Sequence, residues 1–417
     1  MVGRQMSARK RIDIGWFDLL YAGSRLVCWD DAEGARMDCE QAWSDRDDSI
    51  VCLSVRSGFD LYLSVLELPE GSEVLVSAVT ILDMVRIVEE HGLVPVPVDL
   101  NLETMAPDPE DIAVAITPKT RAILFAHLFG TVVDISPIAE IAQAHHLVLI
   151  EDCAQAYAGN RYRGHPDADV SMFSFGPIKT STALAGGILT VRDSKTLRAM
   201  QARQSAYPVQ PRRKFGQRVM FYSFLKWLGG KSVFGVFVKC CKMCGVDFER
   251  LLSSAVRNFP SAEFFYALRQ RPNAPMCRLL RRRILLFDDN RLDQRSKAGW
   301  LLVEKLRGLV HCPGTGNANH CFWIFPISVE GNKTPLIEAL RQQQFDANAS
   351  GQLRVVPCPG STDSPLPSNA ECCLKSILFL PLEAEMKVGD IEAMSQVIAL
   401  NLQREPAEIS SIPNRPM

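Results

Sequence analysis

The residues of this chain whose types and spacing could do chemistry are a lysine, an aspartate and a serine–glycine pair. Lys179 follows a predicted strand, Asp152 comes directly after another, and Ser57-Gly58 precedes a stretch with helical periodicity. A lysine amine can form a Schiff base with a carbonyl group, and a carboxylate can keep a ring nitrogen protonated. A serine–glycine turn before a helix offers hydrogen-bond donors to a phosphate group. Together these are the groups that a site for pyridoxal 5′-phosphate requires.

The elements that must position these residues lie between about residue 50 and residue 192. Short apolar runs alternate there with amphipathic stretches, which is typical of a mainly parallel sheet covered by helices on both faces. Ligands bind beyond the carboxyl ends of the strands in such sheets, where Asp152 and the loop after Phe175 are expected. The predicted fold class is therefore α/β. The predicted strands are Glu73–Ser77, Leu93–Val98, Arg121–Ala126, Leu147–Ile150, Val170–Phe175 and Gly187–Val191.

The stretch that carries this chemistry also resembles a known family. The segments in question are Glu151-Asp152-Cys153-Ala154-Gln155, Phe173-Ser174-Phe175, Lys179 and Gly186-Gly187. In order and spacing they resemble segments of the DegT/DnrJ/EryC/StrS sugar aminotransferases, a branch of the fold type I pyridoxal-phosphate enzymes. The resemblance covers about residues 50–192 and is thinner over 290–400. It implies a large domain with a mainly parallel sheet covered by helices, and a smaller C-terminal α+β domain.

The resemblance implies a role for each matching residue at the reactive end of the cofactor. Lys179 would be the catalytic Schiff-base lysine and would move the proton during amino transfer. Asp152 would pair with the protonated ring nitrogen. Gln155 would lie near the phenolic oxygen of the ring.

The resemblance also implies which residues hold the cofactor phosphate. Ser174 and the Ser57-Gly58 turn would donate hydrogen bonds to it. Asn273 matches the family asparagine that reaches the phosphate of the partner subunit, although its Arg-Pro-Asn-Ala-Pro context differs from the usual one.

Two positions depart from the family pattern. Phe59 stands where the family has a threonine whose hydroxyl donates to the phosphate, and Ile81 stands near the position of the aromatic residue that stacks on the ring. Losing a hydrogen bond to a charged group costs on the order of 1.5–3 kcal/mol, and losing a stack costs about 1 kcal/mol. The core chemistry is present but the pocket is unusual, so we expect an unusual substrate.

These observations predict an aminotransferase that moves an amino group from an amino acid to a keto-sugar or a related ketone. Family analogy names glutamate as the donor and implies a homodimer. Sugar dehydratases of the family replace the lysine with histidine, so Lys179 argues against dehydration. The alternative is a catalytically idle relative that acts as a binding or membrane-associated partner in glycan or antibiotic biosynthesis, with Phe59, Ile81 and the apolar segment 219–238 in its favour.

The sequence predicts five regions. They are an N-terminal arm (1–49), the large cofactor-binding domain (50–207), a divergent aromatic-rich insertion or interface segment (208–289), the small domain (290–405) and a disordered tail (406–417). Within the third region, Val219–Val238 is aromatic and apolar but interrupted by lysines and glycines, which disfavours a membrane span. A buried or subunit-interface hairpin and a peripheral membrane contact both remain open for this segment.

Composition excludes several other classes of protein. The formal net charge is -1, which gives no general attraction to nucleic acid. The 13 scattered cysteines predict reduced thiols and a cytoplasmic protein, and no secretory signal is expected at the N-terminus. Cys240, Cys241 and Cys244 lack a second ligand pair at zinc-ribbon spacing, so no metal site is predicted.

Overall fold

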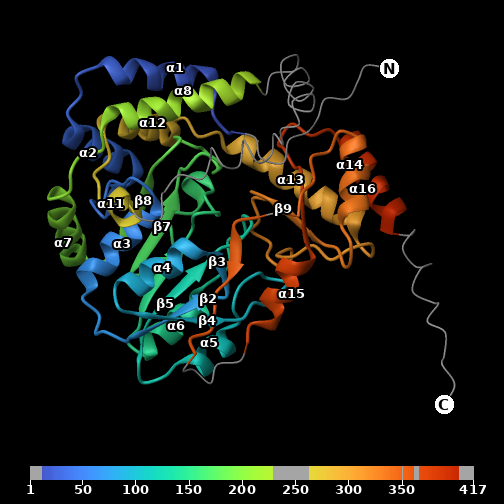
Figure 1. Cartoon of the computed structure of the whole chain (residues 1–417), viewed down its shortest axis with the longest axis horizontal. Helices are drawn as coiled ribbons and strands as arrows, with labels where there is room; N and C mark the ends of the chain where they lie inside the picture. Colours follow the sequence, from blue (N-terminus) through green and yellow to red (C-terminus); the bar gives the residue numbers. More distant parts are fainter. Residues whose placement is uncertain (1–11, 229–262, 350, 361–365, 403–417) are drawn as a thin grey trace.

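The structure, a computed structural model, describes residues 12–228, 263–349, 351–360 and 366–402 of the 417-residue chain. A seven-stranded sheet forms the centre of the molecule, with helices on both of its faces and a smaller region beside it (Figure 1).

The central sheet has the strand order β1-β8-β7-β6-β5-β2-β4. The five consecutive strands β4, β2, β5, β6 and β7 pair in parallel, whereas β8 is antiparallel to both β7 and β1. The mainly parallel sheet predicted from the apolar runs is therefore confirmed. The strands are β1 (Ser49–Cys52), β2 (Glu73–Ser77), β4 (Val94–Val98), β5 (Thr120–Ala126), β6 (Val148–Asp152), β7 (Val170–Ser174) and β8 (Gly187–Val191).

Apolar residues on both sides of the strands explain why helices cover both faces. In β2, Val74 and Val76 join one core with α3, α4 and α7, while Leu75 joins a second core with α5 and α6. Alternate strand residues point to opposite faces, so a continuous apolar run needs cover on each side. The covering helices are α3 (Val55–Leu66), α4 (Leu82–Glu90), α5 (Pro109–Ala115), α6 (Ser136–Ala144) and α7 (Ser194–Ser205), with a 3-10 turn at Gly159–Arg161.

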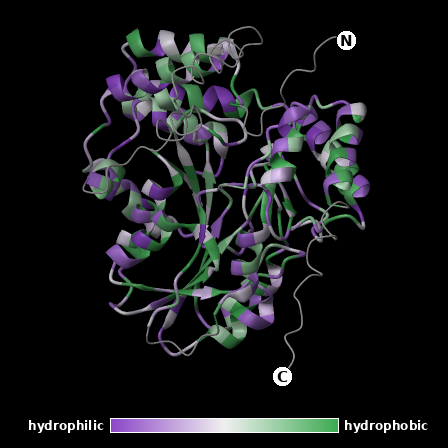
Figure 2. Cartoon of the chain, turned by 45° about the vertical axis from the view of Figure 1, so that its right-hand side comes forward, coloured by the Kyte–Doolittle hydropathy of each residue, from purple (hydrophilic) through white to green (hydrophobic). Residues whose placement is uncertain are grey.

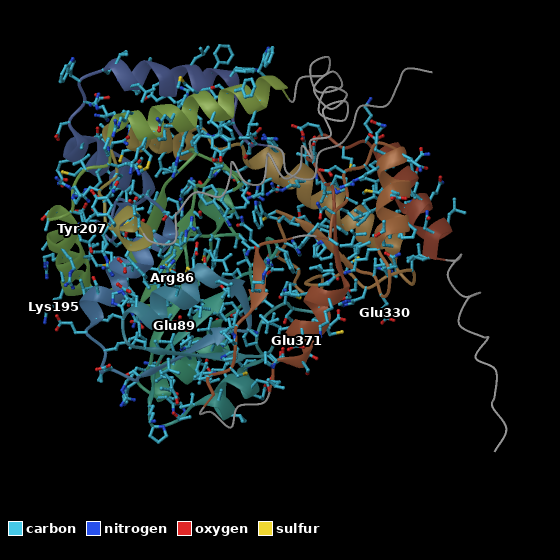
Figure 3. All side chains as sticks on the ribbon, viewed as in Figure 1. Arg86, Glu89, Lys195, Tyr207, Glu330 and Glu371 are labelled. Atoms are coloured by element: carbon cyan, nitrogen blue, oxygen red, sulfur yellow. The ribbon has the colours of Figure 1, made fainter. Side chains whose placement is uncertain are left out.

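A layer of helices from two distant parts of the chain caps the β8 end of the sheet. The N-terminal helices and the helices after residue 211 share one core, in which Trp43 packs against Tyr157, Phe173 and Phe175. Arg86 of α4, labelled in Figure 3, lies over the rings of Phe264 (4.6 Å) and Phe265 in α11. The helices that share this core are α1 (Trp16–Val27), α2 (Ala32–Trp43), α8 (Arg212–Leu228) and α12 (Ala274–Leu285), whereas α11 (Phe264–Leu268) packs in the core of α3 and α4.

The C-terminal part forms a smaller α+β region with its own core. In it β9 and β11 pair antiparallel, and β10 pairs with β3 (Val79–Ile81) of the large region, which ties the two regions together. The predicted small α+β domain is confirmed in its class. Its elements are α13 (Asp289–Leu306), β9 (Phe325–Ser328), α14 (Thr334–Gln342), β10 (Leu353–Val355), α15 (Ser368–Ser376), β11 (Ile377–Leu380) and α16 (Val388–Leu402).

The aromatic-rich segment Val219–Val238 is described only in its first half. Residues 219–228 form the second half of α8, and residues 229–238 lie outside the described part of the chain, as do Cys240, Cys241 and Cys244. Among the described residues, no helix combines the length and apolar character that crossing a membrane requires.

Candidate functional site

Asp152 stands at the carboxyl end of β6, where the sequence predicted it. Its Oδ1 accepts a hydrogen bond from the Ala154 amide (2.9 Å), and its main-chain oxygen accepts one from the His127 amide (3.1 Å). Burial raises the pKa of the Asp152 carboxyl, and the Ala154 amide and the positive charge of Lys179 offset part of that rise. A cationic partner would therefore stabilise the ionised form of the half-buried Asp152 carboxyl.

Lys179 lies in the turn that follows β7 and faces the small region. Its amide donates to the Gly176 carbonyl (3.0 Å), and its Nζ lies 4.3 Å from the ring centroid of Trp323. The indole is fixed in turn, because Trp323 Nε1 donates to the Ile178 carbonyl (2.9 Å). The amine is therefore held between the end of the sheet and an aromatic residue of the small region.

Ser174, the last residue of β7, lies close to the start of helix α3. It pairs with Gly187 across the antiparallel β7–β8 ladder. A Cβ on Gly187 would lie 2.5 Å from the backbone nitrogen of Val55, the first residue of α3. Only glycine allows this approach, which brings the first-turn amides of α3 to β8, beside its pairing partner Ser174. Such amides form an anion site at a helix start.

Ser57 and Gly58 lie inside the first turn of α3 rather than in a turn before it. The helix is capped by Ser54, whose Oγ accepts from the Ser57 amide (3.2 Å) and lies 3.1 Å from Ser57 Oγ. A Cβ on Gly58 would lie 2.2 Å from Leu189 Cδ1, so Gly58 lets the helix pack closely on β8. The predicted turn is therefore corrected to a helical first turn.

Gln155 is engaged with the loop after β5. Its Oε1 accepts from the Phe129 amide (3.0 Å), and Phe129 and Gly130 both have positive φ angles (58° and 102°). A Cβ on Gly130 would lie 2.5 Å from the backbone nitrogen of Trp323, so position 130 requires a glycine, without a side chain, for the small region to pack this closely. Gln155 thus holds the backbone that lies against Trp323.

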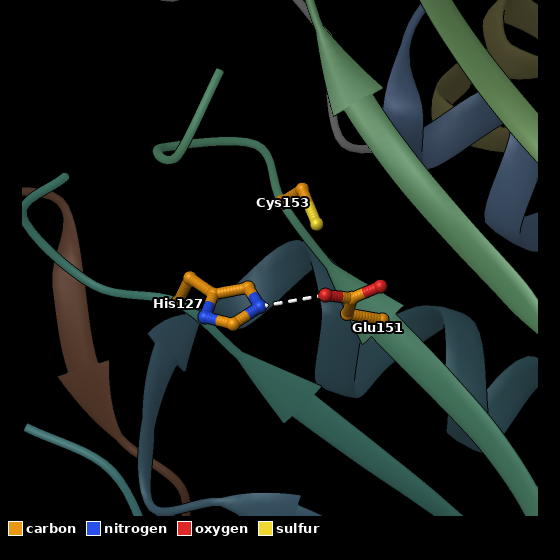
Figure 4. A group of neighbouring side chains, drawn as sticks. All are labelled: His127, Glu151 and Cys153. Carbon is orange, nitrogen blue, oxygen red and sulfur yellow. Dashed lines mark hydrogen bonds and ion pairs between the residues drawn. The ribbon is translucent and has the colours of Figure 1, made fainter. Parts of the chain in front are cut away.

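A buried network lies directly behind Asp152 and centres on Glu151 (Figure 4). His127 Nε2 donates to Glu151 Oε1 (2.8 Å), and the Val133 amide donates to His127 Nδ1 (3.2 Å), which fixes the neutral tautomer with the proton on Nε2. Tyr162 donates to the same carboxylate oxygen, and Ser171 Oγ donates to Oε2 (2.5 Å).

The network keeps the Glu151 carboxylate ionised in spite of its burial. Burial alone would raise its pKa, but hydrogen bonds from His127, Ser171 and Tyr162 outweigh it and lower the pKa to about 2. Cys153 completes a compact group with His127 and Glu151, within 4.8 Å. Both imidazole nitrogens and both carboxylate oxygens already have hydrogen-bond partners, so this group lacks the free lone pairs that a metal ion needs.

Asn273 does not take the position that the sequence predicted for it. It caps α12: its Oδ1 accepts from the Met276 amide (3.1 Å), and its Nδ2 donates to the Gln210 carbonyl (3.4 Å). The residue is 1% exposed, so its amide does not reach out toward a partner subunit. The assignment of Asn273 to a partner's phosphate is therefore corrected to a buried helix cap.

The two departures from the family pattern are packing residues in this chain. Phe59 is fully buried in the core between α3, α4 and the sheet. Ile81 ends β3, pairs with Leu353 and packs against the edge of the same core. The interpretation of Phe59 as a missing phosphate donor is corrected, because a threonine there would put its hydroxyl into an apolar core.

Sequence reasoning missed three parts of this site. Ser54 could have been found, because a serine just before a helical stretch is a common N-cap. The His127–Glu151 pair joins residues 24 apart in the sequence, and its only local signal was that both follow predicted strands. Trp323 gave no signal, because its neighbour Ile178 is 145 residues away.

The donor set fits pyridoxal 5′-phosphate. An amine and a carboxylate act on each other electrostatically at the ends of β7 and β6, as the reactive carbon and the ring nitrogen of the cofactor require. The cradle formed by Gly187, Ser174 and the start of α3 supplies the donors that a phosphate requires.

Comparison with known sequences agrees with the resemblance seen in the motifs. Residues 41–223 match the model of the DegT/DnrJ/EryC1/StrS aminotransferase family. The GDP-perosamine synthase of Escherichia coli O157:H7 is 39% identical over 140 residues, which are 33% of this chain and 38% of that protein. The GDP-perosamine synthase of Caulobacter vibrioides is 35% identical over 148 residues, 35% of this chain and 40% of that protein. The chain thus matches about two fifths of the length of these relatives.

Solved structures match over nearly the whole chain. Helicobacter pylori PseC, an aminotransferase of pseudoaminic acid biosynthesis, has a TM-score of 0.70 at 15% identity and covers 96% of this chain and 100% of its own. The aminotransferase TlmJ from Streptoalloteichus hindustanus has a TM-score of 0.69 at 16% identity, with coverages of 95% and 99%. At such identities the likeness shows the fold, and the predicted fold class is confirmed.

Proposed function

Since residues 41–223 match the model of the DegT/DnrJ/EryC1/StrS aminotransferase family, we propose that this chain is a pyridoxal-phosphate-dependent aminotransferase. It transfers an amino group from an amino acid, glutamate by family analogy, to a keto-sugar or a related ketone. The observation that carries the proposal is that the positive charge of Lys179, in the turn after β7, acts on Asp152 at the end of β6, next to the cradle formed by Gly187 and the start of α3.

The proposed work of Lys179 is to hold the cofactor through its Nζ and to move a proton at that atom. The indole of Trp323 below Nζ supports this role, because a π face stabilises the ammonium form without accepting its proton. When bound, the cofactor withdraws electrons from the carbon that carries the amino group and so makes its proton removable.

Asp152 would hold the proton on the ring nitrogen. Its raised pKa makes the carboxylate a good proton acceptor, and a cationic ring would restore its ionised form. The Glu151 network supports this role indirectly, since His127, which is bonded to Glu151, also donates its amide to the Asp152 carbonyl. Glu151 and His127 are therefore positioning residues in the proposal.

The phosphate would lie at the start of α3. Ser174 Oγ, the Ser57 hydroxyl and the first amides of the helix are the proposed donors, and the helix dipole favours the phosphate charge there. Gly58 would contribute through the close packing of this turn, because its amide donates to the Ser54 carbonyl (3.0 Å). Gln155, which its contact with the Phe129 amide orients, would lie near the phenolic oxygen of the ring.

The names of the two sequence relatives point to a GDP-linked sugar as the acceptor in those proteins. We propose a keto-sugar acceptor for this chain and rank GDP-linked keto-sugars first for testing. The idle alternative rested on Phe59, Ile81 and the apolar segment 219–238. Packing accounts for Phe59 and Ile81, and residues 229–238 lie outside the described part of the chain.

Two further parts of the proposal concern the state of the protein in the cell. We propose a cytoplasmic homodimer, as the family resemblance and the reduced cysteines indicate. In the described part of the chain the cysteines are free thiols. Sedimentation of the purified protein measures the dimer directly.

The experiment that tests the proposed function uses glutamate labelled with heavy nitrogen and a panel of keto-sugars, GDP-linked ones included. We expect an amino-sugar product that carries the label with the wild type and none with Lys179→Ala. The matched control is Lys195→Ala, an exposed lysine on α7 (Figure 3), which should transfer the label normally. Equal transfer by Lys179→Ala, or no labelled product from any acceptor, would overturn the proposal.

A further inference from the structure

The outward face of helices α1 and α8 exposes large apolar side chains. On α1, Trp16, Phe17 and Leu20 are 47%, 82% and 68% exposed. The outer apolar patch consists of these three residues and of Met220, Phe224 and Trp227 on α8, each of which is more than half exposed. Helical spacing places the α8 members on one stripe, because residues three and four apart share a face.

The two helices lie antiparallel and side by side (Figure 1). At one end, Arg212 Nη2 donates to the Asp30 carbonyl (2.7 Å) just after α1. At the other end, Lys226 Nζ lies 6.0 Å from the ring of Trp16. The exposed aromatic residues of the two helices therefore gather at the same end of the pair.

The inward faces of both helices join one core, so their outward faces point the same way. Leu19 and Ala22 of α1 and Phe215 and Val219 of α8 belong to the core shared with α12. Hydrophobic positions are visible in Figure 2 on the helices at the top of the molecule, away from the sheet. An exposed apolar patch of this kind marks a surface that binds a partner.

Charge indicates which partner the patch fits. Helix α8 has no acidic residue, and its basic residues are Arg212, Arg213, Lys214, Arg218 and Lys226. The one acidic residue of α1, Asp18, is buried against Arg282 and Arg283 at 2.8 Å from each. Arg213 and Lys214 are exposed, whereas Arg212 donates to the carbonyls of Cys28 and Asp30 and Arg218 donates to that of Leu184. The face is therefore apolar at one end and carries exposed basic residues at the other, without an exposed carboxylate on either helix.

A second copy of the chain is a poor match for this face. A two-fold contact brings identical patches together, so the exposed basic residues of each copy would meet a face whose two helices offer no exposed carboxylate. An anionic bilayer complements the face in both respects. Tryptophan and phenylalanine insert at the level of the lipid head groups, and lysine and arginine bind the anionic surface.

We propose that the outer face of α1 and α8 is a docking surface for an anionic lipid bilayer, on which the protein lies without crossing it. The homodimer proposed above would then use a different face. This inference does not rest on the proposed amino transfer, because the patch belongs to helices outside the site.

Flotation of the full-length protein with vesicles tests the proposal. We expect the wild type to float with vesicles that contain phosphatidylglycerol and to stay behind with vesicles of phosphatidylcholine alone. Because the Debye length falls from ~10 Å at 0.1 M salt to ~3 Å at 1 M, high salt should weaken binding. Replacing Phe17 and Phe224 together by serine should weaken it at least about tenfold, since two large apolar side chains no longer enter the bilayer.

Two further variants separate the contributions. Arg213→Gln with Lys214→Gln removes two exposed charges and should weaken binding about fivefold for each residue. Val114→Ser is the matched control, because Val114 is 84% exposed on α5, at the other end of the molecule in Figure 1. It should float like the wild type.

Two results would overturn the proposal. One is the absence of the wild type from the floating fraction with phosphatidylglycerol vesicles. The other is a homodimer that dissociates when Phe17 and Phe224 are replaced, since the patch would then be a contact between copies of the chain.

Discussion

Replacing Glu151 by glutamine tests how much the hydrogen bonds of the buried network around Glu151 contribute to the free energy of unfolding. The carboxylate is fully buried and accepts from His127 Nε2 (2.8 Å), the His165 amide (2.9 Å), Ser171 Oγ (2.5 Å) and the Tyr162 hydroxyl. A glutamine offers one acceptor oxygen in place of two. Its amide group would face donors and leave them unpaired in the interior.

The size of the effect follows from the pKa of Glu151, which is lowered from 4.5 to about 2. Each unit is worth about 1.4 kcal/mol, so ionisation of the folded-state carboxyl contributes on the order of 3 kcal/mol. A lowered pKa gives stability that is complete above the unfolded-state pKa. That stability is lost as the pH falls from about 4.5 through about 2.

Urea denaturation at a series of pH values is the assay. We expect Glu151→Gln to lower the free energy of unfolding by about 3 kcal/mol at neutral pH. The gap to the wild type should narrow as the pH falls below about 4.5, because the wild type then loses its ionised carboxylate.

Glu103→Gln is the matched control, because Glu103 also contacts a histidine, His311, at 3.0 Å, but its side chain is 66% exposed. An exposed pair contributes about 0–1 kcal/mol. A loss in Glu151→Gln no larger than in this control, or a gap that does not change with pH, would refute the reasoning.

Three more predictions concern the site itself. Asp152→Asn should leave the fold intact and nearly abolish amino transfer, because a neutral amide does not keep the ring nitrogen protonated; turnover like the wild type would contradict this. Phe59→Thr should lower the free energy of unfolding by about 3 kcal/mol or more without tightening cofactor binding, since the ring is fully buried; a tighter dissociation constant would show that residue 59 faces the phosphate. Trp323→Phe should weaken cofactor binding about fivefold through loss of its bond to Ile178, and Trp323→Ala about thirtyfold; equal affinities would show that Trp323 does not support Lys179.

Six of the seven strands of the central sheet could be predicted, because each is an apolar run of ordinary strand length, whereas β1 (Ser49–Cys52) was not predicted. Glu73–Ser77 and Gly187–Val191 have the bounds that the sequence predicted, and the others differ by one or two residues at an end. Local composition decides such elements, since both faces of the sheet must be covered. Asp152 followed from the same logic, as the residue at the carboxyl end of a buried strand.

The sequence was a weaker guide where a residue's role depends on distant packing. Gly58 was predicted to lie in a turn, but it lies in helix α3. Glycine is required there because a Cβ would clash with Leu189 on strand β8, a contact that a local stretch of sequence does not reveal. Asn273 was assigned to a partner's phosphate by family resemblance, although an asparagine two residues before Pro275 also fits a helix cap. Neither distinction is visible in a local window of sequence.

The outer apolar patch could also be predicted only in part from the sequence. The aromatic residues of α8 could be noticed in the sequence, but Trp16 and Phe17 join them only through the antiparallel contact of two helices about 200 residues apart. Tyr222, which belongs to the same aromatic run, is buried in the core and takes no part in the patch. Only the structure shows which of these aromatic side chains are exposed.

The most direct test of the central claim is to find which lysine holds the cofactor. The purified protein is incubated with pyridoxal 5′-phosphate, reduced with borohydride, digested and analysed by mass spectrometry. We predict a pyridoxyl group on Lys179, the lysine whose charge acts on Asp152 and whose Nζ lies over the ring of Trp323. A pyridoxyl group on another lysine, or on none, would contradict it.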